Sequence, residues 1–286
     1  MNQQVKGYIT LCKPRILFLV MLTSAMGFFL GAHNFHNIKL LCFTLLGTGL
    51  SCAGAGVLNN YLERDVDKQM KRTCKRPIPT GVIAPADAFI FGVILVLAGT
   101  ILLVLEVNLL SGFLALLTAF LYVLVYTPLK RVTWLNTFIG AIPGALPPVG
   151  GWAAATGQLS LEAWVLFLIM FLWQHPHFYA IAWMYKEDYA RGGFKMLPVV
   201  DPSGISTFRQ IVIYSILLIV GSALPTILGM AGLVYLTCTL ALGVGMLVIG
   251  ILLWRSHSVQ DARRLLRASI IYLPLVLVLV IIDAIL

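Results

Sequence analysis

The sequence predicts an all-helical, polytopic membrane protein with nine transmembrane helices. Of its 286 residues, 60% are hydrophobic and only 11% are charged, whereas an ordinary soluble domain is ~45–50% apolar and ~25% charged. So few charges could not cover a water-exposed surface. The composition therefore excludes a water-soluble enzyme, a disordered chain and a nucleic-acid-binding module. The lengths of the apolar stretches and the distribution of basic residues support the same fold class.

Nine apolar stretches are long enough to cross a bilayer, which takes ~20 residues of helix. Each stretch is continuous and lacks the alternating pattern of a barrel strand, so helices fit better than strands. The predicted spans cover residues 16–32, 40–58, 88–105, 109–127, 134–152, 161–183, 211–228, 231–253 and 268–286.

The basic residues test the number of spans. With nine spans and a cytoplasmic amino terminus, all but one of the 20 Lys and Arg residues fall on the inner side, and the exception is Lys39. An excess of Lys and Arg in cytoplasmic loops is expected of membrane proteins. The carboxyl terminus is then periplasmic. A short amino-terminal segment of ~15 residues, without a cleavage site or transit segment, favours a bacterial inner membrane.

Two inner connections are long: residues 59–87 after the second span and 184–210 after the sixth. Long ordered connections usually carry function. Because these two are four spans apart, they indicate an internal repeat. The sequence therefore predicts one domain, 1–286, with halves near 1–130 and 131–286.

The first polar motif follows the second span. Asn59, Glu63 and Asp67 recur at every fourth residue, so a continuing helix would carry them on one face. Two carboxylates and an amide oxygen suit Mg²⁺, which often shares its coordination shell with substrate phosphates. Cations beside such a metal would neutralise charge on a leaving diphosphate. The spacing also fits a solvated, salt-bridged helix end. The predicted diphosphate ligands from this segment are Lys68, Arg72 and Arg76.

A second polar motif follows the sixth span. Tyr185, Lys186, Glu187, Asp188 and Tyr189 form its polar tip on the same inner side. Two carboxylate-bearing helix ends on one face of the membrane could share a metal. A capped, solvated helix end is the alternative.

These motifs resemble the UbiA-type intramembrane prenyltransferases, whose first acidic motif is similar to the N-x-x-x-E-x-x-x-D at 59–67. Four further blocks resemble, more narrowly, the branch of that family that farnesylates heme. They are NYLERDVDKQMKRTCKRPIPTG (60–81), YTPLKRVTWLN (126–136), GAIPGALPPVGGW (140–152) and WQHPHF (173–178). YKEDYARGGFKMLPVV (185–200) belongs to the same set. The resemblance covers nearly the whole chain, in order.

The resemblance implies a ring of nine transmembrane helices around a central cavity, with cytoplasmic cap loops after helices 2 and 6. It implies transfer of the farnesyl group of farnesyl diphosphate to a vinyl group of heme B, with addition of water, giving heme O and diphosphate. Mg²⁺ or a similar divalent cation would serve the diphosphate, and heme B is a substrate rather than a cofactor. The expected partners are both substrates and the lipid bilayer. A downstream heme-modifying enzyme or a terminal oxidase assembly is a further candidate.

One departure from the family concerns its second motif, D-x-x-x-D. Tyr185 and Tyr189 occupy the two Asp positions here, with Asp188 between them. We assign Asp188, rather than Glu187, to the metal site. The predicted catalytic residues are thus Asn59, Glu63, Asp67 and Asp188, and the three carboxylates among them are the predicted metal ligands.

The candidate heme residues are His175 and His177, which flank Pro176 inside the sixth span. Polar groups at membrane depth are costly and suggest function, so each could ligate iron or bond a propionate. Helix packing is the alternative. Their spacing turns them apart, so both are not expected on one iron. Tyr126 and Tyr185 are further heme candidates, and Lys130, Arg131 and Lys186 are further diphosphate candidates.

The stretch at 140–152 is rich in glycine and proline. Broken helices within a membrane often line a cavity, so its small residues could leave room for a macrocycle or an isoprenoid tail. Close helix packing explains small residues equally well.

Two other functions fit the same pattern. A prenyltransferase acting on a quinone precursor or a chlorin would share most motifs, but the W-Q-x-P-H-F block favours heme. A secondary transporter would also have broken helices and intramembrane acids. Here the carboxylates cluster at the inner ends of the spans rather than at mid-membrane, which favours the enzyme.

Overall fold

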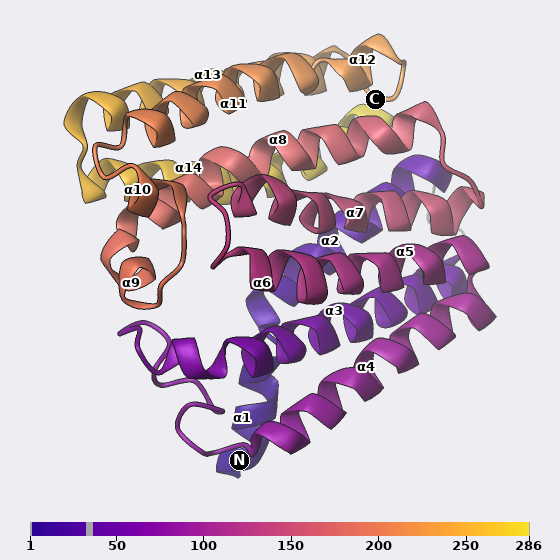
Figure 1. Ribbon diagram of the computed structural model, residues 1–286. Coiled ribbons are helices and arrows are strands. Elements are labelled where there is room, and N and C mark those ends of the chain that lie inside the picture. The colour runs from indigo at the N-terminus through magenta and orange to yellow at the C-terminus, as the bar shows by residue number, and fades with distance from the viewer. Residues whose placement is uncertain (1, 33–36, 286) are drawn as a thin grey trace.

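The computed structural model describes residues 2–32 and 37–285, and all regular elements in these ranges are helices. The long helices lie side by side in one bundle (Figure 1). Seven segments of the described chain are long and apolar enough to cross a membrane. They are α2 (Pro14–Ala32), α3 (Ile38–Asp67), α4 (Pro85–Glu106), α5 to α6 (Leu109–Leu129), α8 (Leu161–Met184), α11 to α12 (Ile205–Ile227) and α13 (Leu233–Ser256). The chain is therefore a multi-pass membrane protein, as predicted.

Two further long helices are α7 (Asn136–Thr156) and α14 (Val259–Ile285). The three prolines and four glycines of α7 lower its mean hydropathy. In the bundle, α7 packs against α2, α5 and α8, while α14 packs against α8 and α13. Spanning by these two helices, and with it the count of nine, stays a prediction, as does the division into two halves. Residue 286 of the last predicted span lies outside the described residues.

Three predicted boundaries shift in the structure. The second span, predicted to end at 58, continues as α3 to Asp67. The seventh begins as α11 (Ile205–Gly221), earlier than 211, and α14 begins well before 268. A further helix, α1 (Gln3–Leu11), precedes the first span. The reason is common to all four: hydropathy marks the apolar part of a helix, whereas polar helical turns extend beyond it.

The two long connections meet at one end of the bundle, on the left in Figure 1. The first follows α3, and the second carries the short helices α9 (Lys186–Arg191) and α10 (Leu197–Val200). Gly192 at the end of α9 lies so close to Val66 and Met70 that a Cβ there would crowd both side chains. The loops are therefore packed together rather than separate, and they form the cap predicted after the second and sixth spans.

The glycines of α7 mainly permit close helix packing. A Cβ at Gly151 would overlap the backbone carbonyl of Ser24 in α2, and one at Gly144 would overlap the Gln174 amide in α8. Gly140 lies against the ring of Tyr126 in the same way. A Cβ at Gly150 would have no described atom within 4 Å. Close packing therefore explains three of the four glycines, and Gly150 is the one that faces open space.

This packing predicts opposite outcomes at two adjacent residues. Gly151→Ala should lower stability by roughly 1–3 kcal/mol or more, because overpacking forces backbones apart. Gly150→Ala should leave stability unchanged or slightly higher, since alanine is the better helix former. Thermal unfolding of both variants in detergent checks this, and equal midpoints for the two would refute the close α2–α7 contact.

Candidate active site

The last turns of α3 form the centre of a polar site at the capped end of the bundle. Because α3 is helical as far as Asp67, the side chains of Asn59, Glu63 and Asp67 lie on one face. These residues are only 1%, 7% and 0% exposed, respectively. Buried polar and charged groups are costly unless they are paired. The partners of these three residues therefore define the site.

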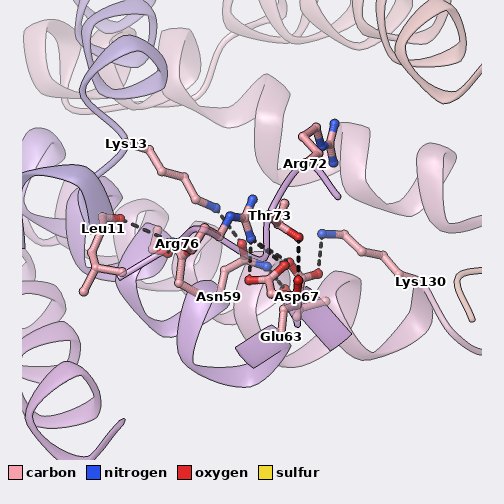
Figure 2. A network of polar contacts seen from close by, with 12 residues as sticks. Leu11, Lys13, Asn59, Glu63, Asp67, Arg72, Thr73, Arg76 and Lys130 are labelled. Atoms are coloured by element: carbon pink, nitrogen blue, oxygen red, sulfur yellow. Dashed lines mark hydrogen bonds and ion pairs between the residues drawn. The ribbon is translucent and has the colours of Figure 1, made fainter. Parts of the chain in front are cut away.

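Each carboxylate has a cationic partner from another segment (Figure 2). Lys130 Nζ lies 2.7 Å from Glu63 Oε1. Arg76 Nη1 donates to both oxygens of Asp67, at 2.9 and 2.7 Å. The same nitrogen is 3.8 Å from Glu63 Oε2. Arg76 therefore bridges the two carboxylates, while Lys130 pairs with Glu63 alone.

A third cation comes from the amino-terminal segment. Lys13 Nζ donates to Asn59 Oδ1 at 2.5 Å and to the Tyr122 hydroxyl at 3.2 Å. Asn59 in turn donates to Thr127 Oγ1 at 3.0 Å. Lys13 lies between α1 and α2 with a backbone φ of 52°, which is uncommon for a residue with a side chain. Figure 2 shows its side chain extending toward Asn59.

The two lysines differ in their protonation. Burial lowers the pKa of Lys13 to about 7, and the positive charge of Arg76 acts in the same direction. Burial would also lower the pKa of Lys130, but the Glu63 carboxylate outweighs burial and raises that pKa above its ordinary value. Lys130 is therefore a permanent cation, whereas Lys13 is close to its titration point at neutral pH.

A π-helical segment, η1 (Leu121–Tyr126), precedes α6 (Thr127–Leu129) and places several of these partners. Widened turns of this kind often occur at functional sites. The Lys130 ammonium lies 4.5 Å from the centre of the Tyr126 ring, and that ring is 5.6 Å from the ring of Tyr122. Two aromatic rings therefore border the cations.

The second cap loop contacts the first through Asp188. Its two carboxylate oxygens accept the backbone N–H groups of Lys71 and Arg72, both at 3.0 Å. Asp188 also forms an ion pair with Arg191. The Arg72 guanidinium stands over the rings of Tyr185 and Tyr189.

The structure brings together Asn59, Glu63, Asp67, Arg76 and Lys130 among the predicted site residues. It does not bring Asp188 to the two carboxylates of α3, and no group of three or more His, Cys, Asp or Glu side chains in the described residues could hold a metal ion. Both Asp188 oxygens instead contact backbone amides.

Three predicted diphosphate ligands also lie apart from the carboxylates. Lys68 pairs with Asp65 at 3.2 Å, and the Lys186 ammonium stands over the Trp183 ring at 4.1 Å. Arg131 is exposed. These three side chains are therefore placed as solvated or anchoring cations rather than as diphosphate ligands.

The two histidines of α8 face different helices. The His175 ring stacks on Tyr214 of α11 at 3.6 Å, and its Nδ1 lies 2.7 Å from the Phe171 carbonyl oxygen. His177 Nδ1 lies 2.8 Å from Ser269 Oγ of α14. His175 is fully buried, and its Nε2 has no hydrogen-bond partner among the described residues, whereas His177 is partly exposed. The two rings thus diverge, as their spacing predicts.

Three members of the site were not predicted from sequence: Lys13, Tyr122 and Thr127. Lys13 counted only as a topology anchor, and its position directly before Pro14 was the one available signal. Tyr122 and Thr127 lie in an apolar span and carry no pattern that separates them from packing residues.

Comparison with known proteins places this arrangement in a family. Residues 20–273 match the model of the UbiA prenyltransferase family. The chain belongs to that family. Protoheme IX farnesyltransferase of Solibacter usitatus is 49% identical over 98% of this chain and 99% of its own length. The Salinibacter ruber protein of the same name is 44% identical over 96% of this chain and 98% of its own.

Solved UbiA-type structures share the fold. One described as digeranylgeranylglyceryl phosphate synthase in membranes has a TM-score of 0.81 at 21% identity, covering 99% of both chains. A UbiA homolog from Archaeoglobus fulgidus bound to DMAPP and Mg²⁺ has a TM-score of 0.70 at 16% identity, covering 95% of this chain and 99% of that one. The predicted family and all-helical membrane fold are confirmed.

Proposed function

We propose that this protein transfers the farnesyl group of farnesyl diphosphate to a vinyl group of heme B, with addition of water, giving heme O and diphosphate. One observation carries the proposal: relatives 49% and 44% identical over nearly the whole chain are named protoheme IX farnesyltransferase. The polar site supports it, because buried carboxylates surrounded by cations suit a metal-bound diphosphate.

The side chains of α3 fit Mg²⁺ delivered with a diphosphate. Mg²⁺ commonly binds through one or two carboxylates plus substrate phosphates rather than in an all-protein cage. Glu63 and Asp67 offer two carboxylates on one helix face, next to the Asn59 amide. When bound there, Mg²⁺ would stabilise the charge that develops on the diphosphate as its C–O bond breaks. The Archaeoglobus homolog bound to DMAPP and Mg²⁺ supports a divalent cation as the companion of the diphosphate.

The cations of the site would hold the diphosphate. Arg76 and Lys130 now neutralise the carboxylates; with Mg²⁺ on those carboxylates, both cations can turn to phosphate oxygens. Arginine binds phosphate through two parallel hydrogen bonds. Lys13 reaches the same place from the opposite side. As the diphosphate leaves, farnesyl C1 bonds to the terminal vinyl carbon of heme, water adds to the inner vinyl carbon, and one proton is released.

The proposed site lies at the cytoplasmic end of the bundle. It takes farnesyl diphosphate and heme B in a bacterial inner membrane, with the amino terminus cytoplasmic and the carboxyl terminus periplasmic. The excess of basic residues on the capped side supports this orientation. Heme O would pass from here to a downstream heme-modifying enzyme or a terminal oxidase assembly.

For heme contact we favour His177. Ser269 donates its hydroxyl proton to the Leu266 carbonyl, so its oxygen accepts the Nδ1–H of His177. That fixes the tautomer whose Nε2 lone pair can ligate iron, a common arrangement for metal-binding histidines. His175 has the same tautomer, because the Phe171 carbonyl can only accept a hydrogen bond. Its ring is fully buried against the ring of Tyr214, so it is not accessible to heme.

His177→Ala is therefore expected to change the absorption spectrum of bound heme and to weaken heme affinity roughly tenfold or more, as loss of a ligating group would. His175→Ala should leave the spectrum intact and mainly lower stability. Titrating heme B into each purified variant and the double variant measures both effects. An unchanged spectrum and affinity in all three would mean that both histidines only pack helices.

A competition among acceptors tests the function. Purified protein with labelled farnesyl diphosphate and Mg²⁺ is offered heme B, a quinone-precursor aromatic acid or a chlorin. We expect label in heme B alone. Transfer to either other acceptor, with heme B unlabelled, would refute the proposed substrate.

A further inference from the structure

Asp188 holds the backbone of the loop that carries Arg72. Its carboxylate spans the N–H groups of two consecutive residues, Lys71 and Arg72, at 3.0 Å each. Hydrogen bonds to an ionised acceptor are about twice as strong as neutral ones. Arg191, one turn further along α9, pairs with the same carboxylate. This arrangement fixes the first cap loop against the second.

Tyr185 and Tyr189 hold the side chain of the same arginine. The centre of the Arg72 guanidinium lies 4.8 Å from the Tyr185 ring centre and 5.1 Å from that of Tyr189. Its Nη2 also donates to the Tyr189 hydroxyl at 3.1 Å. A guanidinium has five N–H donors in a fixed plane. With its orientation set by two rings and one hydroxyl, its other donors remain for an anion.

The second cap loop also forms hydrogen bonds with the segment that carries Lys130. The backbone N–H of Lys195 donates to the Lys130 carbonyl at 2.8 Å, and the Lys195 carbonyl accepts from the Asn136 amide at 2.9 Å. Phe194 lies 5.9 Å from the Lys130 ammonium. The loop after α8 therefore contacts two separate cation-bearing segments.

We propose that the loop after α8 serves as a scaffold for the diphosphate-binding cations: Asp188, Tyr185 and Tyr189 are positioning residues that present Arg72 to the diphosphate, and Asp188 is not a metal ligand. The inference rests on the proposed function, since farnesyl diphosphate is the ligand that Arg72 would meet. The Arg72 guanidinium, held against two tyrosine rings, then supplies a fixed positive charge on the same loop as Arg76.

The test measures binding of farnesyl diphosphate to the purified full-length protein by calorimetry, with Mg²⁺ and without heme B, so that no transfer occurs. Asp188→Asn and the double variant Tyr185→Leu/Tyr189→Leu should each raise Kd roughly 3- to 10-fold, the range expected from loss of cation–π and charged hydrogen bonds. Tyr189→Phe, which removes one hydroxyl, should have a smaller effect. Glu187→Gln changes an exposed neighbouring carboxylate and should have none.

Two further readouts separate positioning from metal binding. The Mg²⁺ concentration for half-maximal binding should stay within about twofold of wild type in Asp188→Asn. Adding Tyr185→Leu/Tyr189→Leu to Arg72→Ala should not weaken binding beyond Arg72→Ala alone, because the tyrosines act through Arg72. Thermal unfolding shows which variants remain folded. If Asp188→Asn does not fold, the affinity of Tyr189→Phe for farnesyl diphosphate still tests the proposal.

A large rise in the Mg²⁺ requirement of Asp188→Asn, with the tyrosine variants unaffected, would overturn the proposal and make Asp188 a metal ligand. Additive losses in the Arg72→Ala background would also overturn it. Failure of the proposed function looks different: wild-type protein would bind farnesyl diphosphate in this assay and yet leave heme B unmodified.

Discussion

Glu63→Gln and Asp67→Asn are each expected to lower turnover by roughly 10²-fold or more. Both side chains are almost fully buried on the inner face of α3, and each is held by a cation that a diphosphate would attract. Loss of either carboxylate removes an oxygen ligand from the Mg²⁺ that stabilises the departing diphosphate. Steady-state rates at saturating farnesyl diphosphate and heme B measure the effect.

The same helix provides a matched control. Asp65 lies between the two carboxylates in sequence, but its side chain is 70% exposed and pairs with Lys68. Asp65→Asn should keep nearly wild-type turnover.

Glu63→Gln leaves Lys130 buried without its partner, which can cost roughly 3–5 kcal/mol of stability. Thermal unfolding of each variant separates that loss from a loss of catalysis. Wild-type turnover in both Glu63→Gln and Asp67→Asn would refute the assignment of Mg²⁺ to the carboxylates of α3.

Arg76→Ala should weaken farnesyl diphosphate binding roughly 10- to 100-fold, because hydrogen bonds to charged groups contribute about 1.5–3 kcal/mol each. The affinity for heme should be nearly unchanged. Arg76 contacts both α3 carboxylates and is the cation best placed to turn from them to a phosphate. Calorimetric titration of each substrate separately gives the two affinities.

Arg64→Ala is the matched control for this change. Arg64 is in the same polar stretch, but its guanidinium stacks on Tyr61 and bonds the Tyr61 carbonyl. Its removal should leave farnesyl diphosphate affinity within about twofold of wild type. If Arg76→Ala instead lowered heme affinity and spared the diphosphate, the two substrate sites would be assigned the wrong way round.

The sequence predicted the acidic face of α3 because helical spacing is local. Asn59, Glu63 and Asp67 repeat every four residues, and nothing between them interrupts a helix, so their common face follows from the helical period. Seven of the predicted spans follow in the same way from apolar length and are confirmed in the described residues. The count of nine and the side on which each loop lies stay predictions from the basic residues.

What the sequence could not provide are contacts between distant segments. Lys13 bonds to Asn59 across 46 residues, and its place depends on the turn between α1 and α2. The sequence predicts Asp188 as a metal ligand, because sequence alone cannot distinguish a carboxylate that binds a metal from one that accepts hydrogen bonds from backbone amides. Small residues in α7 are equally ambiguous in the sequence. In the structure, a Cβ added at Gly140, Gly144 or Gly151 would overlap a neighbouring residue, so packing explains these three glycines.

The most direct test of the central claim is the mass of the heme after incubation of the purified protein with heme B, farnesyl diphosphate and Mg²⁺. The account predicts a product with the mass of heme B plus the elements of farnesol, together with one diphosphate released per product. Mesoheme, whose vinyl groups are replaced by ethyl groups, should give no product, and neither should heme B with Glu63→Gln. Unmodified heme B after incubation with folded protein that binds both substrates, or product formed from mesoheme, would contradict the account.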